Sequence, residues 1–204
     1  MAKLALIGAS GNVGSKILAE ALSRGHQVAG IVRNPEKLPR HPNLTAVRGD
    51  VYDADGLAKL LAGHDAVISS VHYTASDPAL LLQAVKASGV KRYLVVGGAG
   101  SLEVAPGVQL VDTPEFPALY KEEASKGRDY LNLLRGETGL DWTFLSPSAL
   151  IAPGERTGKF RLGGDQLLVG ADGQSRISQE DYAVALIDEL EKPAHSRQRF
   201  TVGY

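Results

Sequence analysis

The chain has 204 residues, and its 22 basic and 23 acidic residues give a formal net charge of −1. This near-neutral, mixed charge argues against a nucleic-acid-binding protein, and the absence of cysteine excludes disulfides and cysteine-ligated zinc. No apolar run approaches the ~20 residues of a membrane span, and the N-terminus lacks a secretory signal pattern. We therefore expect one cytoplasmic domain over residues 1–204, with no metal site and no nucleic-acid or membrane partner.

The first predicted element is a buried strand at residues 3–7, followed by a glycine-rich turn and an amphipathic helix that ends near Gly25. Gly8 permits a tight turn, Gly11 lets the backbone approach a pyrophosphate, and Gly14 lets the helix pack closely on the sheet. The amides and dipole at the start of the helix favour phosphate. An ordinary strand-to-helix turn that merely uses glycine is the alternative. We predict a dinucleotide site formed by Gly8, Ala9, Ser10, Gly11, Asn12, Val13 and Gly14.

The spacing Gly-x-x-Gly-x-x-Gly resembles that of extended and atypical short-chain dehydrogenases/reductases. The chain is most similar to the compact NmrA-like group, which includes NADH-flavin reductases and the biliverdin reductase B type. Asp141-Trp142-Thr143, the proline that follows, and residues 177–183 also resemble this family, so the resemblance covers essentially the whole chain. It implies a Rossmann-like fold that binds NAD(P).

A second strand is predicted at residues 27–32, and it runs into Arg33 and Asn34. A protein that prefers NAD places an acid here for the ribose 2′-hydroxyl, whereas arginine can pair with a 2′-phosphate. An exposed arginine at a strand end is the alternative. The position of Arg33 favours NADP(H) over NAD(H).

The third strand, residues 44–48, precedes Asp50 and Val51. The resemblance places this segment beside the adenine, where Asp50 would accept a hydrogen bond from the exocyclic amine. From the residues alone, Asp50 is a polar residue at the end of a strand. Both residues are counted as candidate cofactor contacts.

A fourth strand at residues 65–71 has the apolar character of a buried parallel strand. In open α/β sheets, ligands lie beyond the carboxyl ends of the strands, near the point where strand order reverses. We therefore expect Ser70 and Val71 to lie along the cofactor. His72 comes next and is a candidate catalytic residue, although a lone histidine more often is not.

A helix at about residues 78–88 and a fifth strand at residues 92–96 complete five strand–helix repeats, which predict a doubly wound parallel α/β sheet. The long loop that follows, residues 98–117, leaves the edge of the sheet where a nicotinamide and its substrate would lie. Loops of this length are usually functional. We expect Gly98 beside the cofactor and Ser101 on the substrate side.

The C-terminal part, residues 146–204, departs from the alternation of strands and helices, and its pattern predicts a small hairpin-and-helix lobe on the substrate side. A helix with Tyr120 near its start and a sixth strand with Ser148 just after it lead into this lobe. The predicted elements are a helix at 118–135, a strand at 141–145, a hairpin of 158–162 with 166–169 around Gly163-Gly164-Asp165, a helix at 181–191 capped by Ser178, and a strand at 199–203.

Typical short-chain dehydrogenases carry Tyr-x-x-x-Lys, whose lysine lowers the pKa of the tyrosine. No tyrosine of this chain has lysine four residues later; Tyr120 is followed there by Ala124. The flavin and biliverdin type also tends to have a serine after strand five and a histidine after the sixth-strand proline. Gly98 and Ser148 stand at those positions, which argues against biliverdin-type chemistry.

Reducing a ketone creates an alkoxide that needs a proton, whereas a flavin spreads the added charge over a large ring system. The missing pair therefore favours an NAD(P)H-dependent oxidoreductase that reduces a planar flavin or quinone-like acceptor. A non-catalytic NAD(P) sensor of the NmrA-like type, or a sugar-nucleotide epimerase or dehydratase, are the alternatives. A homodimer is left open. The candidate catalytic residues are His72, Ser101, Tyr120 and Ser148.

Overall fold

The computed structural model describes all of residues 1–204. The helices are α1 (Asn12–Ser23), α2 (Ala54–Leu61), α3 (Pro78–Ser88), α4 (Ala118–Arg135) and α5 (Gln179–Glu191). The strands of the main sheet are β1 (Lys3–Ile7), β2 (Gln27–Val32), β3 (Leu44–Arg48), β4 (Ala66–Ser69), β5 (Arg92–Val96), β8 (Asp141–Pro147), β10 (Arg161–Gly163) and β12 (Gln198–Gly203). Two small pairs are formed by β6 (Glu103–Ala105) with β7 (Val108–Gln109), and by β9 (Leu150–Ala152) with β11 (Arg176–Ser178).

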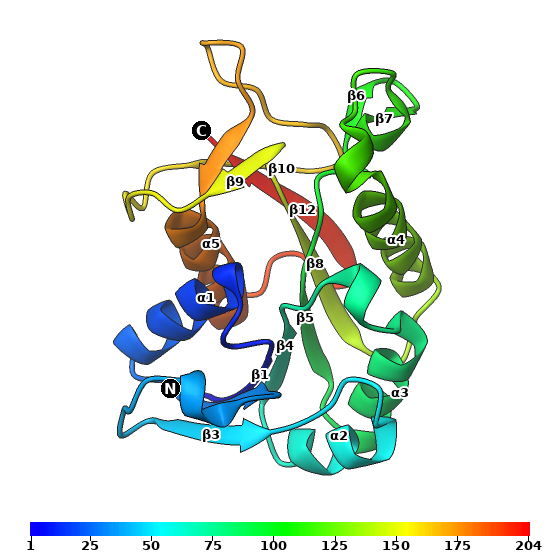
Figure 1. The fold of residues 1–204 in the computed structure, drawn as a ribbon. Helices are drawn as coiled ribbons and strands as arrows, with labels where there is room; N and C mark the ends of the chain where they lie inside the picture. Colours follow the sequence, from blue (N-terminus) through cyan, green and yellow to red (C-terminus); the bar gives the residue numbers. More distant parts are fainter.

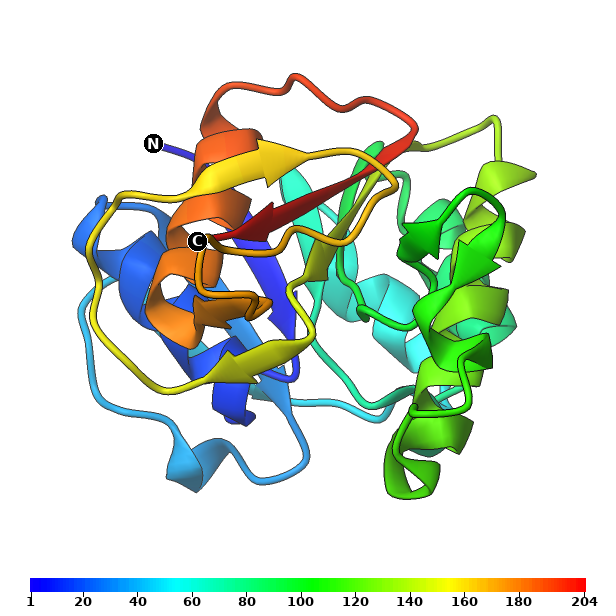
Figure 2. The ribbon, with the colours of Figure 1, turned by 90° about the horizontal axis from the view of Figure 1, so that it is seen from above.

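The eight strands of the main sheet lie in the order β10-β12-β8-β5-β4-β1-β2-β3. All neighbours pair in parallel except β10, which runs antiparallel to β12. Helices α1 and α5 cover one face of this sheet, and α2, α3 and α4 cover the other (Figures 1 and 2). The predicted doubly wound α/β fold is therefore confirmed.

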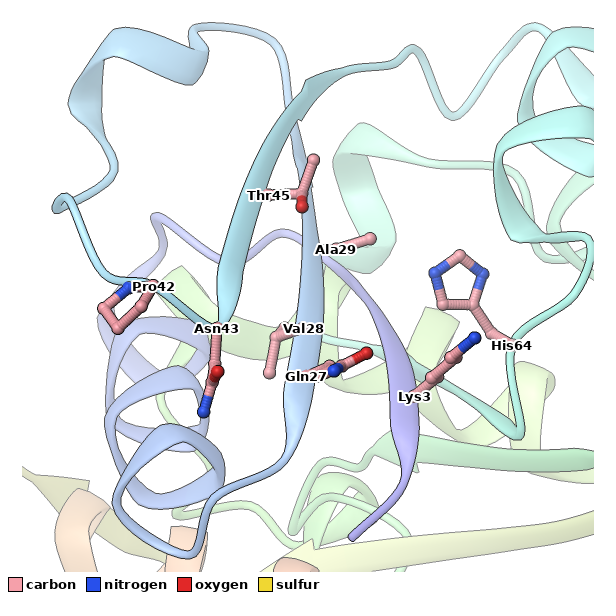
Figure 3. Close-up of a pocket in the computed structure, with 8 residues that line it drawn as sticks. All are labelled: Lys3, Gln27, Val28, Ala29, Pro42, Asn43, Thr45 and His64. Atoms are coloured by element: carbon pink, nitrogen blue, oxygen red, sulfur yellow. The ribbon is translucent and has the colours of Figure 1, made fainter.

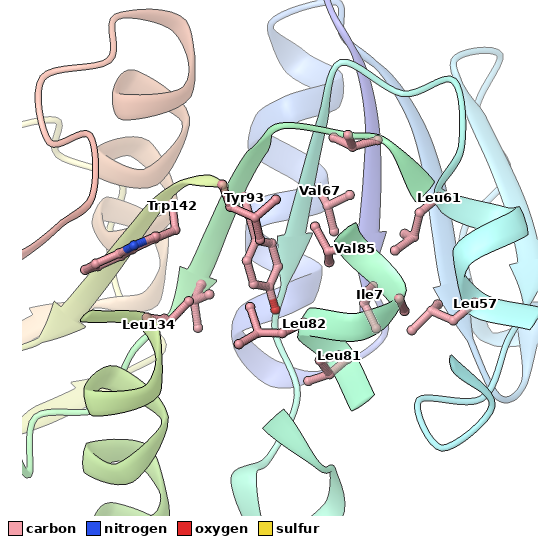
Figure 4. Packing of buried hydrophobic residues seen from close by; sticks show 14 of the residues in the cluster. Ile7, Leu57, Leu61, Val67, Leu81, Leu82, Val85, Tyr93, Leu134 and Trp142 are labelled. Carbon is pink, nitrogen blue, oxygen red and sulfur yellow. The ribbon is translucent and has the colours of Figure 1, made fainter. Parts of the chain in front are cut away.

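Alternating strand residues build two apolar cores, one on each face of the sheet. On β1, Ala5 and Ile7 face α2 and α3, while Leu4 and Leu6 face α1 and α5. The core beneath α2, α3 and α4 is shown in Figure 4, where Tyr93 lies near its centre. Burial on both faces explains the nearly continuous apolar runs of these strands, and it leaves the strand ends as the places where polar groups gather.

The helix ends follow the local signals in the sequence. Gly25, just beyond α1, has φ +79°, a left-handed conformation that glycine adopts easily. Asp77 caps α3 by accepting a hydrogen bond from the amide of Ala79, and Ser178 caps α5 by accepting one from Asp181. The predicted capping residues are confirmed, but α5 begins at Gln179, two residues before the predicted start at Asp181.

The predicted hairpin of residues 158–169 is wrong. Arg161–Gly163 pairs with Thr201–Gly203 at the edge of the main sheet. The segment that was expected to fold back on it instead pairs with the loop after β5, because Leu167 donates to the carbonyl oxygen of Glu103 at 2.9 Å. Each half of the expected hairpin therefore satisfies its backbone groups on a different, more distant strand.

Candidate cofactor and substrate site

The order of the strands reverses between β1 and β4, since the chain builds β2 and β3 on one side of β1 and then crosses to the other. Backbone hydrogen bonds hold the strand ends together here. The amide of Ser70 donates to the carbonyl oxygen of Ile7 at 2.9 Å, and the amide of Gly8 donates to that of Ile31 at 2.9 Å. This is the position at which open α/β sheets bind ligands.

The three glycines of the first turn have different structural roles. Gly8 has φ +82°, and a Cβ added to it would lie 2.1 Å from the carbonyl oxygen of Ser70. A Cβ on Gly14 would lie 2.1 Å from the carbonyl oxygen of Gly8. Gly11 is exposed, and its nearest neighbour would be 3.3 Å away. Packing therefore requires Gly8 and Gly14, whereas the bare backbone at Gly11 leaves room for a ligand.

The N-terminus of α1 is free to bind an anion. Its N-cap is Gly11, which makes no side-chain capping bond, and the first turn contains no acidic residue. The first intrahelical bond runs from the amide of Ser15 to the carbonyl oxygen of Gly11, so the amides of Asn12, Val13 and Gly14 have no acceptor within the chain. Such a helix end is suited to phosphate groups, and these residues fit the pyrophosphate of a dinucleotide.

The ends of β2 and β3 add polar groups to the same edge of the sheet. Val32 is in register with Arg48, and the amide of Gly49 donates to the carbonyl oxygen of Val32 at 3.1 Å. Arg33 and Asn34 follow β2 and are exposed, with no side-chain partner.

After β3, Asp50 is exposed, and its Oδ1 accepts the amide of Tyr52 at 2.9 Å. Its other carboxylate oxygen has no partner within the chain. The half-buried Val51 packs against the core beneath α2. Two predicted cofactor segments, residues 33–34 and 50–51, thus follow the ends of neighbouring strands.

At the end of β4, Ser70 and Val71 contact the glycine turn: Val71 Cγ1 would lie 3.1 Å from a Cβ on Gly8. His72 follows, with 82% of its side chain exposed, and its Nδ1 lies 3.3 Å from Oε1 of Glu123. A Cβ on Gly98, just after β5, would meet only the ring of Tyr73, at 3.7 Å. The ends of β4 and β5 therefore leave an open surface beside the glycine turn.

Tyr120 lies in the first turn of α4, is 60% exposed, and its hydroxyl has no hydrogen-bond partner within the chain. No lysine stands beside it at the spacing that would activate it. Phe116, in the loop before α4, is half-buried. The two rings belong to the segment expected on the substrate side.

Ser101 and Ser148 differ from expectation, because both are buried rather than facing an open site. Ser101 Oγ accepts a hydrogen bond from the guanidinium of Arg199, whose stronger partner is Asp165. Ser148 Oγ donates to the carbonyl oxygen of Val202 at 2.9 Å. Both hydroxyls stabilise the contact of β12 with its surroundings, a contact between residues about fifty or more positions apart that local sequence patterns do not reveal.

The opposite edge of the sheet carries a separate shallow pocket (Figure 3). Lys3, Gln27 and Thr45 line it from the amino-terminal halves of β1, β2 and β3, and His64 lines it from the turn between α2 and β4. No group of three or more histidine, aspartate or glutamate side chains is placed to hold a metal ion. None of the helices combines the length and the apolar composition needed to cross a bilayer.

Comparison with known proteins agrees with this geometry. Residues 8–193 match the family model described as NAD(P)H-binding. Three solved structures superpose over nearly the whole chain. A candidate exported protein of Burkholderia pseudomallei is 47% identical with TM-score 0.90, covering 100% of both chains. A candidate epimerase of Bacteroides thetaiotaomicron is 45% identical with TM-score 0.95, covering 99% of this chain and 96% of that one. A candidate NADH-flavin reductase of Streptococcus pneumoniae is 37% identical with TM-score 0.83, covering 100% and 99%.

Proposed function

The chain belongs to the NAD(P)H-binding family of atypical short-chain dehydrogenases/reductases, and on that premise we propose that it reduces a planar acceptor, a flavin or a quinone, with NADPH. One observation supports this proposal: the chain combines a glycine turn suited to phosphate with a substrate region in which no lysine accompanies the tyrosine that would donate a proton. The glycine turn supplies the amides and the close approach, while the only tyrosine at the expected place, Tyr120, has no lysine to lower its pKa.

The residues proposed to hold the cofactor lie along the carboxyl ends of five parallel strands. The amides after Gly11 would bind the pyrophosphate. Arg33 would pair with a ribose 2′-phosphate, which favours NADPH over NADH, and Asp50 would accept from the adenine amine. Ser70, Val71 and Gly98 would border the nicotinamide half. When bound, the cofactor supplies the hydride, and the chain supplies orientation and exclusion of water.

The acceptor would lie against Phe116 and Tyr120. An aromatic wall suits a flat, conjugated molecule, whose ring system delocalises the charge that arrives with the hydride. An alcohol or ketone would instead need a proton donor whose pKa is matched to the task. The assignment of the S. pneumoniae neighbour as a candidate NADH-flavin reductase supports the same reading.

The B. thetaiotaomicron neighbour is a candidate epimerase, which supports a different class of reaction, epimerisation; for this chain the substrate of such a reaction would be a sugar nucleotide. We rank this second, because such enzymes usually use the Tyr-x-x-x-Lys pair that this chain lacks. A sensor that binds NAD(P)H without turnover is the third candidate. A homodimer is compatible with all three.

Anaerobic stopped-flow mixing distinguishes these functions. Purified protein is mixed with NADPH or NADH and then with riboflavin, FMN or a naphthoquinone, while absorbance at the nicotinamide band is followed; UDP-glucose is tested separately for epimerisation. We expect oxidation of NADPH by at least one planar acceptor. Conversion of the sugar nucleotide alone would favour the epimerase. Tight binding of NADPH with no turnover in any arm would favour the sensor.

A further inference from the structure

A carboxylate from α4 holds the turn that follows β4. This turn is the short 3₁₀ helix η2 (Tyr73–Ala75). Glu123 Oε1 accepts the amide of Tyr73 at 2.8 Å, and its Oε2 accepts the amide and the hydroxyl of Thr74 at 2.9 and 2.8 Å. His72 Nδ1 approaches Oε1 as well, at 3.3 Å. One side chain thus satisfies the leading amides of η2 from a helix about fifty residues away.

A second contact joins the same two elements four residues further along α4. Tyr73 is buried, and its hydroxyl donates to the carbonyl oxygen of Val96, at the end of β5, at 2.6 Å. Its ring lies so close to Gly127 that a Cβ there would be 2.6 Å from the ring. Residues four apart share a face of a helix, so Glu123 and Gly127 together present one face of α4 to η2.

The charge of Glu123 suits it to this role. Burial raises the pKa of its carboxyl group, but the hydrogen bonds from Thr74 and Tyr73 and the nearby His72 outweigh burial, and the net pKa is lowered. An ionised carboxylate only accepts hydrogen bonds, and it faces three donors at hydrogen-bond distance besides the longer His72 contact. A glutamine there would turn an NH₂ group toward one of these donor sets.

The two elements joined by Glu123 belong to different halves of the site. The turn η2 directly follows Ser70, Val71 and His72 at the cofactor edge, whereas Tyr120 lies three residues before Glu123 on α4. We infer that Glu123 is a positioning residue, which fixes η2 to α4 and thereby sets the spacing between the cofactor edge and the aromatic wall of the acceptor. The kinetic consequence rests on the proposed function, whereas the structural linkage does not.

The structural linkage is tested by hydrogen exchange of the full-length protein. In E123Q, the NH₂ group replaces one of the two acceptor oxygens, so either the amide of Tyr73 or that of Thr74 loses its acceptor. The exchange of that amide should accelerate about tenfold, equivalent to roughly 1.4 kcal/mol of local opening. The control E122Q changes the neighbouring residue, which is exposed and pairs with Lys126, and it should leave these amides unchanged. Equal exchange in E123Q and the wild type would overturn the inference. This readout decides it even for a protein that oxidises no NADPH.

The kinetic consequence is tested with E123Q and G127A, which disturb the same contact by charge and by steric overlap. Both should raise KM for the acceptor by about tenfold, while Kd for NADPH, measured by fluorescence, stays within about twofold, because the glycine turn is held separately through Ser70 and Ile7. T74V, which removes one of the hydrogen bonds, should show a smaller effect and serves if E123Q does not fold. If these variants have a lower melting temperature but an unchanged KM for the acceptor, Glu123 is a purely structural residue. That result would overturn the inference that Glu123 positions the acceptor side.

Discussion

Gly8 and Gly14 meet backbone to backbone, so closely that a Cβ on Gly14 would lie 2.1 Å from the carbonyl oxygen of Gly8. This contact brings α1 onto the end of β1 and aims its free amides along the sheet edge. Gly11, between them, is exposed, and its contact with the turn is the hydrogen bond from its amide to the carbonyl oxygen of Gly8 at 3.0 Å. Substitutions at these three glycines should therefore affect folding and cofactor binding separately.

Gly11→Val should weaken NADPH binding by roughly 10- to 150-fold, the equivalent of losing about 1.5–3 kcal/mol of charge-assisted hydrogen bonding, because its side chain occupies the approach of the phosphates. Its φ of −72° is open to any residue, so the melting temperature should change little. Gly14→Ala is the contrasting variant and should destabilise the fold itself. Calorimetric binding and thermal melts measure both; a Gly11→Val protein that binds NADPH like the wild type would exclude this loop as the phosphate site.

Arg33→Ala should remove most of the preference for NADPH. A partly exposed contact between arginine and phosphate contributes about 1.5–3 kcal/mol, or roughly a 10- to 150-fold preference over NADH. The affinity for NADH should stay nearly constant and is the internal control, since Arg33 makes no contact that supports the fold. Equal losses for the two cofactors would assign Arg33 a different role.

Tyr120→Phe should lower kcat by less than about tenfold, under ~1.4 kcal/mol of transition-state stabilisation, because the phenol has no partner that activates it. Tyr120→Ala should raise KM for the acceptor more than it lowers kcat, since the ring is proposed to act as a wall. Steady-state kinetics with a flavin and a quinone separate the two effects. A loss of 10³-fold in Tyr120→Phe would reveal a general acid and favour a carbonyl substrate.

Ser148→Ala should cost about 1 kcal/mol in the free energy of unfolding, the usual value of one buried hydrogen bond, and should leave kcat and KM unchanged. The reason is that its hydroxyl is buried and donates to Val202. Denaturant unfolding measures the first effect and steady-state kinetics the second. A selective loss of kcat in a fully stable Ser148→Ala protein would show that Ser148 takes part in catalysis.

Glu20 predicts a pH dependence of stability. Its carboxylate accepts hydrogen bonds from Arg156 and Arg24, and the bond from Arg156 is the largest influence; the pKa is lowered despite the opposing effect of burial. A lowered pKa in the folded state means that this stabilisation is present above the ordinary value of 4.5 and is lost as pH falls through the lowered one.

The variant E20Q should therefore be less stable than the wild type at pH 7, by about 1.5–3 kcal/mol for a charged hydrogen-bond pair. The difference should shrink as the pH is lowered below 4.5. Urea unfolding at several pH values measures it. A difference that stays constant down to pH 3 would show that the glutamine is unfavourable for reasons other than charge.

Local patterns were sufficient for the repeating part of the fold. The strand at residues 3–7, the glycine turn and the capping residues Asp77 and Ser178 each act through neighbours in the sequence, and their predictions agree with the structure. The pairing of residues 161–163 depends on whether the edge of β12 is open, which is a property of the finished sheet. Sequence spacing contains no information on that competition.

The candidate site likewise has one part that local patterns predict and another that depends on contacts distant in the sequence. The cofactor edge follows from topology, because every parallel strand delivers its carboxyl end to the same edge. The contact of Glu123 with Tyr73 spans fifty residues and the burial of Ser148 depends on Val202, so neither leaves a periodic or spaced signal. Residues that hold the site together are for this reason harder to predict than the residues proposed to contact the cofactor.

The place of β12 between β8 and β10 has a consequence for how the protein is made. β8 ends at residue 147 and β12 at residue 203, so 56 further residues must be synthesised before the open edge of β8 receives its neighbour. At ~5–20 residues per second this takes about 3–11 s. During that time the nascent chain presents the unpaired edge of β8, a strand that carries the apolar side chains of Phe144 and Leu145. An unpaired strand edge of this kind can pair with strands of other chains. Slow translation of residues 148–203 would lengthen the period in which the nascent chain is prone to aggregate.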